Sequence, residues 1–167
     1  MEYVTDAQFN RQEPAFLQTV SWTCSAMSLS WLNRAMGIDR GTQEWSAVEL
    51  IGTPEHINSQ YGLMDGSGSR LAALLREDRG AAYTTWLDFQ TLSALVADNA
   101  VLLGGAGWYH WVGVRDYAAD GLSIANSAPG WCGVYDTLNE SQFRALGPFA
   151  AVVVPIHWEF PPPADAA

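Results

Sequence analysis

Four polar residues of this chain have the types and the spacing that nucleophilic catalysis by a thiol requires. Cys24 follows Gln18 by six positions, and His110 and Asn126 come far downstream. A thiol that attacks a carbonyl needs a base for its proton, a group that orients that base, and donors for the oxyanion. The sequence therefore predicts Cys24 as the nucleophile, His110 as the base, Asn126 as the orienting group and Gln18 as an oxyanion donor.

The segment that begins near Cys24 has the pattern of a buried helix. Apolar residues recur at helical intervals from Thr23 to Met36, and Gly37 is a typical helix stop. Cys24 therefore lies in the first helical turn, where the partial positive charge of the helix end favours a thiolate. A nearby imidazole would lower the pKa of the thiol further by forming an ion pair.

The other two members of the set fall on adjoining strands of a predicted hairpin. His110 lies in a strand at 108–116 and Asn126 at the end of a strand at 122–126, with a turn at 118–121 between them. This pairing would bring the Asn126 carboxamide to the His110 ring. There it could accept one ring N–H and fix the tautomer of the base.

Each of these residues also has an ordinary structural interpretation. A single cysteine on an apolar helix is most often a small buried side chain, and Asn126 precedes a turn. A histidine in an aromatic strand is more often structural, but His56 and His157 lie in segments without a polar partner on a neighbouring strand. The Gly-x-Ser-x-Gly elbow of serine hydrolases is absent. Taken together, the four residues favour thiol catalysis with His110 as the base.

The remaining pattern predicts an α+β fold, with helices mainly in the first half and strands mainly in the second. The first seventeen residues are expected to form an extended lead-in. The further expected elements are helices at 42–51 and 71–79, a strand at 82–87, a helix capped by Asp88 and running through Val96, a strand at 100–103, a helix at 140–146 and a strand at 149–155.

Length and charge limit the number of domains and the classes of partner. The 167 residues fit one domain, which we place at 1–160, followed by a disordered Pro-rich tail at 161–167. Eight Lys and Arg against eighteen Asp and Glu give a net charge of −10, which disfavours nucleic acid and anionic membranes. No apolar run has the length of a membrane span and no signal peptide is visible, so a cytoplasmic protein is expected.

The cysteines and tryptophans bear on cofactors and ligands. Cys24 and Cys132 match no zinc-ligand spacing, so no metal and no other cofactor is expected, although a disulfide between the two would remove the nucleophile. Eight tryptophans are many for this length and can line a groove for a peptide or sugar, although core packing is the commoner role. The candidates for substrate binding are Trp22, Trp108, Trp111 and Trp131.

At these positions the chain resembles the peptidase C39-like group of the papain-like cysteine peptidases, which is related to the double-glycine bacteriocin-processing peptidases. The run 18–24 is similar to the family's Gln and the Cys six residues later that opens the central helix. The run 110–117 resembles its His-x-Val-x-Val strand, 122–130 its returning strand, and 88–103 the helix and strand before the His. The C39-like family normally has Asp at the position of Asn126, whereas papain, like this chain, has Asn there. The Asp-Cys-Gly that usually follows the family's Gln is missing from this chain.

The resemblance implies an N-terminal helical lobe, a C-terminal antiparallel sheet and a cleft between them. It also implies a cysteine peptidase or thiol amidohydrolase that acts on a peptide or protein through Cys24, His110 and Asn126, with Gln18 as the oxyanion donor. Two alternatives stay open. One is a catalytically silent module on the same fold that binds a peptide or glycan, and the other is an acyltransferase of the transglutaminase type.

Overall fold

A six-stranded antiparallel sheet forms the centre of the protein, with the strand order β5-β10-β6-β7-β8-β9. The computed structural model describes residues 3–6, 11–14, 17–105, 107, 109–118, 121–128 and 135–155, with the backbone alone at 3–6, 11–14, 118, 135 and 136. The strands are β5 (Tyr83–Leu87), β6 (Asn99–Gly105), β7 (His110–Ala118), β8 (Gly121–Ala125), β9 (Tyr135–Leu138) and β10 (Phe149–Pro155).

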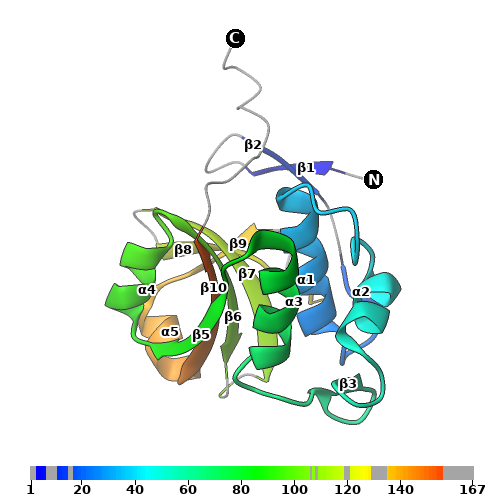
Figure 1. Cartoon of the computed structure of the whole chain (residues 1–167). Helices are drawn as coiled ribbons and strands as arrows, with labels where there is room; N and C mark the ends of the chain where they lie inside the picture. Colours follow the sequence, from blue (N-terminus) through cyan, green and yellow to red (C-terminus); the bar gives the residue numbers. More distant parts are fainter. Residues whose placement is uncertain are drawn as a thin grey trace.

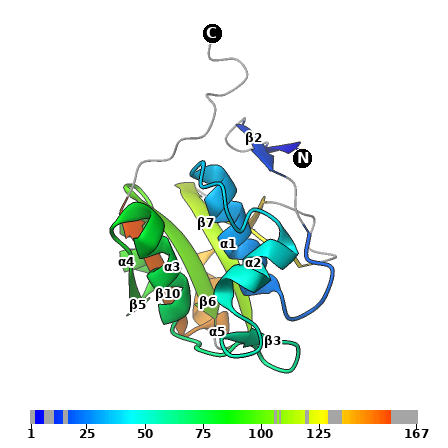
Figure 2. The same ribbon diagram turned by 45° about the vertical axis from the view of Figure 1, so that its right-hand side comes forward.

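Within the described residues, helices cover both faces of this sheet (Figure 1). α1 and α3 pack on one face, α2 packs on α1, and α4 and α5 lie on the opposite face. Figure 2 shows α1 and α2 in front of β6 and β7. The helices are α1 (Cys24–Ala35), α2 (Glu44–Ile51), α3 (Ser69–Arg79), α4 (Phe89–Leu95) and α5 (Glu140–Leu146).

Alternation along the central strands produces two separate apolar cores. In β6, Ala100 and Leu102 join the core beneath α1 and α3, whereas Val101 and Leu103 join the core beneath α4 and α5. β10 divides its side chains between the two cores in the same way. Because successive side chains of a strand point to opposite faces, a strand covered on both sides is apolar throughout. This explains the unbroken apolar runs in the second half of the chain.

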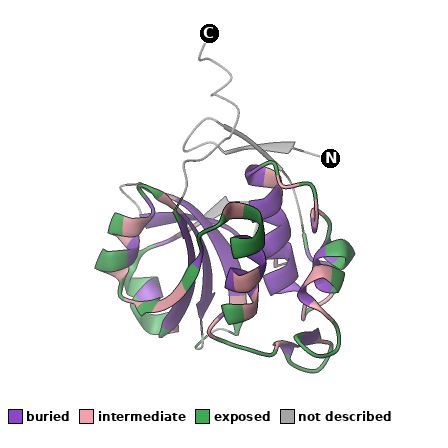
Figure 3. Cartoon of the chain, viewed as in Figure 1, coloured by how far each residue is buried: buried purple, intermediate pink, exposed green. Residues whose placement is uncertain are grey.

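The helix that begins at Cys24 is the most deeply buried of the five. Nearly all of α1 is buried, whereas α3 and α4 expose their outer surfaces (Figure 3). Its Trp31 side chain is fully buried and lies directly over Gly113 of β7, where a Cβ would overlap the indole ring. The glycine lets helix and strand approach closely. This contact fixes α1 against the strand that begins at His110.

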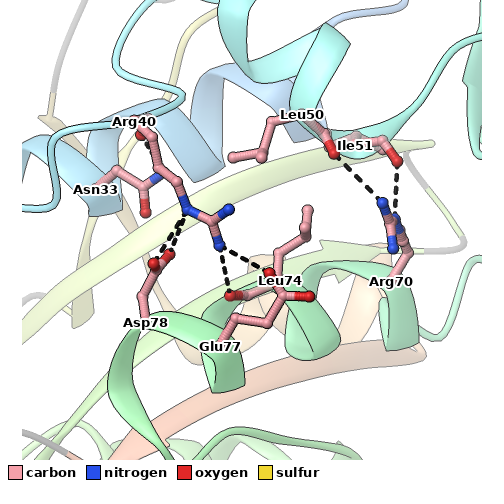
Figure 4. A network of polar contacts seen from close by, with 8 residues as sticks. All are labelled: Asn33, Arg40, Leu50, Ile51, Arg70, Leu74, Glu77 and Asp78. Carbon is pink, nitrogen blue, oxygen red and sulfur yellow. Dashed lines mark hydrogen bonds and ion pairs between the residues drawn. The ribbon is translucent and has the colours of Figure 1, made fainter.

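Charged side chains link α3 to the segments around it (Figure 4). Arg40, between α1 and α2, pairs with Asp78 and Glu77 of α3 at nitrogen to oxygen distances of 3.0 and 3.1 Å. Arg70 of α3 donates from Nε to the carbonyl of Ile51 at 2.8 Å, at the end of α2. A cation at a helix C-terminus satisfies carbonyls that lack a helical partner. Polar contacts as well as the core therefore join α3 to α2 and to the segment that connects α1 with α2.

The α+β fold predicted from the sequence is confirmed, and most elements lie where they were expected. The predicted cap at Asp88 is present, since its side chain accepts a hydrogen bond from Thr91 N–H at 2.7 Å. α2 begins later than expected because Gln43 and Ser46 form a capping box.

The sequence analysis missed several strands. The pairs β1 (Tyr3–Asp6) with β2 (Arg11–Pro14) and β3 (Ile57–Asn58) with β4 (Gly62–Leu63) form two small hairpins. Edge strand β9 was also missed. All of these strands are short and contain polar residues, so they show no detectable hydrophobic period. The tail at 161–167 and the end of the predicted domain lie outside the described residues. None of the described helices combines the length and apolarity that a membrane crossing requires.

Candidate active site

Cys24 and His110 line the same cleft, which has a volume of about 520 Å³. Its walls come from the start of α1, the ends of β6 and β7, the β3–β4 hairpin and β5. None of the described residues that line it is Asp, Glu, Lys or Arg. The cleft therefore presents hydroxyl, amide, aromatic and backbone groups around one thiol and one imidazole.

Cys24 is the first residue of α1 and has a free thiol that is only 8% exposed. Burial raises the pKa of this thiol above its ordinary value, against the opposing effect of backbone hydrogen bonds from Trp111, Ser25 and Cys24 itself. The sequence predicts a lowered pKa from the helix N-terminus, but in the structure desolvation outweighs that effect. The resting thiol is therefore protonated at neutral pH. The contact with the Trp111 backbone also places the sulfur beside the strand that carries His110.

His110 is held from behind by Asn126. The distance from His110 Nε2 to Asn126 Oδ1 is 2.7 Å, and Ala128 N–H donates to the same oxygen at 3.0 Å. Because a backbone N–H can only donate, the Asn126 atom between them must be the oxygen, so Nε2 carries a proton. In the neutral ring the lone pair is then on Nδ1. The predicted pairing of His110 with Asn126 across the hairpin is thus present.

The protonation state of His110 suits a base. Burial lowers the pKa of the imidazole below its ordinary value, and the hydrogen bond with Asn126 acts in the opposite direction. The ring is therefore neutral at pH 7 and able to accept a proton. With a protonated thiol and a neutral imidazole, the resting site carries no net charge.

Asn126 lies directly after β8 and is fully buried. Its Oδ1 is used twice, but its Nδ2 finds no hydrogen-bond partner within the described part of the chain. An unpaired buried donor costs about 1–3 kcal/mol. The base side of the cleft therefore contains an uncompensated polar group directly behind the imidazole.

Gln18 lies behind the cleft rather than among the residues that line it. Its backbone N–H donates to Ser127 O and its Oε1 accepts from Ser127 Oγ, both at 2.9 Å. Its Nε2 donates one hydrogen to Val20 O at 2.9 Å. The structure thus joins Gln18 to the segment that follows β8, next to Asn126, and one carboxamide N–H remains beyond the bond to Val20.

Two of the four tryptophans predicted to bind substrate line the cleft. Trp22 is half-buried on the cleft wall and packs edge-on against Trp45, with ring centroids 5.6 Å apart. Trp111 lines the cleft but is only 7% exposed, because its ring lies over Gly104 and Gly68. The other two candidates, Trp108 and Trp131, lie outside the described residues, as does Cys132.

Several residues of the cleft were missed from the sequence. Tyr61, Trp86 and Tyr109 line it and are 66%, 56% and 92% exposed. Tyr109 directly precedes His110, so its place in the sequence could have indicated that it lies near the site. Tyr61 and Trp86 come from elements far from Cys24, and only the tertiary fold brings them there. Within the described residues, no three His, Cys, Asp or Glu side chains are placed to hold a metal ion.

Comparisons with known proteins support the fold. No family model and no curated protein matches the chain. Solved structures do match, and three of them share 12 to 14% identity with the chain. The double glycine motif protease from an AMS/PCAT transporter, in complex with a leader peptide, matches with a TM-score of 0.58 over 93% of this chain and 99% of its own.

The other two structures come from Bacillus anthracis and from Streptococcus. A C39-like peptidase from Bacillus anthracis matches with a TM-score of 0.57 over 92% of this chain and 98% of its own. The peptidase domain of Streptococcus ComA, a bifunctional ABC transporter, matches with a TM-score of 0.53 over 84% and 97%. Over most of its length, the chain therefore has the same α+β fold as these C39-like peptidase domains.

Proposed function

We propose that this protein is a cysteine peptidase that cleaves a peptide bond with Cys24 as nucleophile and His110 as general base. The observation that carries the proposal is the arrangement around the imidazole. Cys24 and His110 line one cleft, and Asn126 Oδ1 holds His110 Nε2 at 2.7 Å, which leaves the lone pair on the other ring nitrogen. The shared fold of the C39-like peptidase domains supports the same function.

Acylation begins when Cys24 Sγ bonds to the carbonyl carbon of the substrate. The thiol proton passes to His110 Nδ1, and the carbonyl π electrons move to the oxygen. The backbone N–H of Cys24, at the first position of α1, and the second N–H of Gln18 Nε2 are the donors that we assign to this oxyanion. When the intermediate collapses, the C–N bond breaks and the imidazolium gives its proton to the leaving amine.

Deacylation reverses the role of the base. Water attacks the thioester carbon and gives a proton to His110, and the second tetrahedral intermediate expels the sulfur. The proton then returns to Cys24, and the carboxylic acid product leaves. Because the resting pair is neutral, the thiol is deprotonated as it attacks rather than beforehand.

The cleft favours an uncharged segment of polypeptide. Its described lining lacks Asp, Glu, Lys and Arg, and its exposed rings are Tyr61, Trp86 and Tyr109. Aromatic faces stack on apolar side chains and on peptide planes, and they need no charged partner. The leader peptide bound to the double glycine motif protease supports a peptide as the substrate class.

The test is digestion of a peptide library, read by mass spectrometry, with wild type and two pairs of matched variants. Cys24→Ala should abolish cleavage, and Cys132→Ala should retain it. His110→Ala should lower cleavage severely, and His56→Ala, in an exposed loop, should not. Cleavage that persists in Cys24→Ala, at the wild-type rate, rules the proposal out.

A catalytically silent binding module is the second candidate. The raised pKa of Cys24 favours it, because a thiol protonated at neutral pH is a weak nucleophile unless a base assists it. Such a module would bind peptides from the library and leave them uncleaved, and Cys24→Ala would bind the same peptides equally well. An acyltransferase would instead give amide products when a primary amine is added to the digestion.

A further inference from the structure

The segment between the two assigned catalytic groups is attached to one buried carboxylate. Glu44, the first residue of α2, is 8% exposed. Its Oε1 accepts from Thr19 N–H at 2.8 Å and from the Thr23 hydroxyl at 2.6 Å, and its Oε2 accepts from the Thr19 hydroxyl at 2.7 Å. Hydrogen bonds to an ionised acceptor are shorter and stronger than neutral ones. Glu44 thus uses both oxygens on this segment.

The donors to Glu44 occupy the two ends of the segment. Thr19 directly follows Gln18, and Thr23 directly precedes Cys24. One carboxylate therefore sets the distance between the residue that supplies the oxyanion amide and the residue that supplies the sulfur. The Thr23 carbonyl also accepts from Met27 N–H in the first turn of α1. Through Thr23, the carboxylate is connected directly to the start of the nucleophile helix.

The same contacts decide what the Thr23 hydroxyl bonds to. It lies 3.1 Å from Val20 O, the carbonyl that accepts from Gln18 Nε2 at 2.9 Å. A hydroxyl has one hydrogen, and the shorter contact to Glu44 takes it. Without Glu44, that hydrogen would turn to Val20 O, whose second lone pair can accept it beside the Gln18 amide. The carboxylate therefore ties Thr23 to α2 rather than to its own segment.

Glu44 itself is held by the helix that carries it. Ala47, Val48 and Ile51 of α2 are buried in the core around α1. The Gln43 and Ser46 capping box fixes the first turn of α2, and a carboxylate there is stabilised by the helix N-terminus. Because α2 packs on α1, the carboxylate cannot shift without moving the core. Glu44 is therefore a rigid reference point for the segment.

We propose that Glu44 is a positioning residue for the proposed peptidase, which keeps the Gln18 carboxamide in register with the Cys24 sulfur. The inference rests on the function proposed above, because only a reaction that passes through an oxyanion depends on that register. Loss of Glu44 should therefore weaken attack on a carbonyl more than it weakens the reactivity of the thiol.

Two reagents for Cys24 separate these effects. p-Nitrophenyl acetate acylates the thiol through a tetrahedral oxyanion and releases p-nitrophenolate, whereas iodoacetamide alkylates it by displacement of iodide and forms no oxyanion. Glu44→Ala should slow acylation about tenfold, as a misplaced oxyanion donor would, and leave alkylation within about twofold of wild type. Glu49→Ala, an exposed carboxylate of the same helix, should leave both rates unchanged.

Further variants test the route through Gln18. Glu44→Gln keeps the shape of the side chain and can accept two of the three hydrogen bonds while donating to the Thr19 hydroxyl, so it should restore most of the acylation rate. The double variant Gln18→Ala with Glu44→Ala should acylate no more slowly than Gln18→Ala alone, because the two residues act as one unit. Equal losses with both reagents, or additive losses in the double variant, would overturn the inference.

Two outcomes need measurements of their own: a Glu44→Ala variant that does not fold, and a wild type that cleaves no peptide. If Glu44→Ala does not fold, Thr23→Val removes one of the three bonds with the carboxylate in place, and it should still slow acylation more than alkylation. If wild type hydrolyses no peptide, the proposed peptidase fails. The role of Glu44 is then judged by amide hydrogen exchange, where Glu44→Ala should speed exchange at residues 19–24 relative to Glu49→Ala, and unchanged exchange contradicts it.

Discussion

The nucleophile side and the base side of the cleft are fixed in different ways. On the nucleophile side, Gln18 and the segment up to Cys24 make hydrogen bonds to Glu44 and Ser127, and both oxygens of the carboxylate are used. On the base side, His110 depends on Asn126, whose Nδ2 finds no partner in the described part of the chain. The carboxylate that anchors the nucleophile side thus has both oxygens bonded, whereas the amide that anchors the base side retains an unpaired Nδ2 among the described residues.

This difference separates two requirements of the proposed reaction. The sulfur and the oxyanion donors must hold one geometry throughout, so a segment that one carboxylate anchors at both ends suits them. The imidazole must change charge twice in each cycle. An amide behind it fixes the tautomer without stabilising the imidazolium as strongly as a carboxylate would. The lowered pKa of His110 and the raised pKa of Cys24 agree with that arrangement.

The largest expected effect is the loss of the base itself. His110→Ala should lower kcat/KM on a peptide identified from the library about 10³-fold, because it removes the acceptor for the thiol proton. Steady-state kinetics with His56→Ala as the control would measure it. A loss of less than about tenfold would mean that another group takes the proton.

Replacement of the orienting amide by a carboxylate should change the charge state of the site. In wild type burial lowers the pKa of His110 and raises that of Cys24, so near neutral pH both groups are uncharged. Asn126→Asp places a negative charge beside Nε2, which raises the pKa of His110 and allows an imidazolium to lower that of the thiol.

The pH profile of iodoacetamide alkylation measures that change, because the rate follows the thiolate fraction. The wild-type rate should rise only in the alkaline range, because burial raises the pKa of the thiol. In Asn126→Asp the rate at neutral pH should be about tenfold higher, which corresponds to one unit of thiol pKa. Superimposable profiles for the two proteins would contradict the neutral resting pair.

A steric change tests how tightly the base side is packed. Gly104→Ala introduces a Cβ into the Trp111 ring, next to His110, and should reduce the free energy of unfolding by about 1–3 kcal/mol. Gly66→Ala, where the new Cβ has nothing within 4 Å, is the matched control. Urea unfolding of both variants gives the comparison. Equal stability would show that Trp111 can move away.

The smallest expected effect concerns the bond that joins the two sides. Ser127→Ala removes the hydroxyl that donates to Gln18 Oε1 and keeps the backbone bond between the same residues. The free energy of unfolding should fall by about 1 kcal/mol, the net value of one hydrogen bond. Urea unfolding measures this as well, and a loss above about 3 kcal/mol would mean that the hydroxyl supports more than Gln18.

Local patterns predicted the elements that carry the candidate site. The apolar period from Thr23 to Met36 and the following glycine match α1, and the antiparallel pairing of β7 with β8 matches the predicted hairpin of His110 and Asn126. These signals are local, because a helix or hairpin is specified by neighbouring residues. The contact of His110 with Asn126 is diagonal, because the register pairs Ala125 with Gly113, so the local pattern predicts only that the two residues lie on neighbouring segments of the hairpin.

The sequence by itself predicted which side chains could do the proposed chemistry, and it determined the helix and the hairpin that carry them. Only the tertiary structure decided that Glu44 of α2 bonds to both ends of the segment before α1, and that Ser127 bonds to Gln18. It also decided the charge state of the site, because burial raises the pKa of Cys24 where helix position alone predicts a lower one. Desolvation and long-range hydrogen bonds depend on what the whole chain packs around a residue, and no local pattern contains that information.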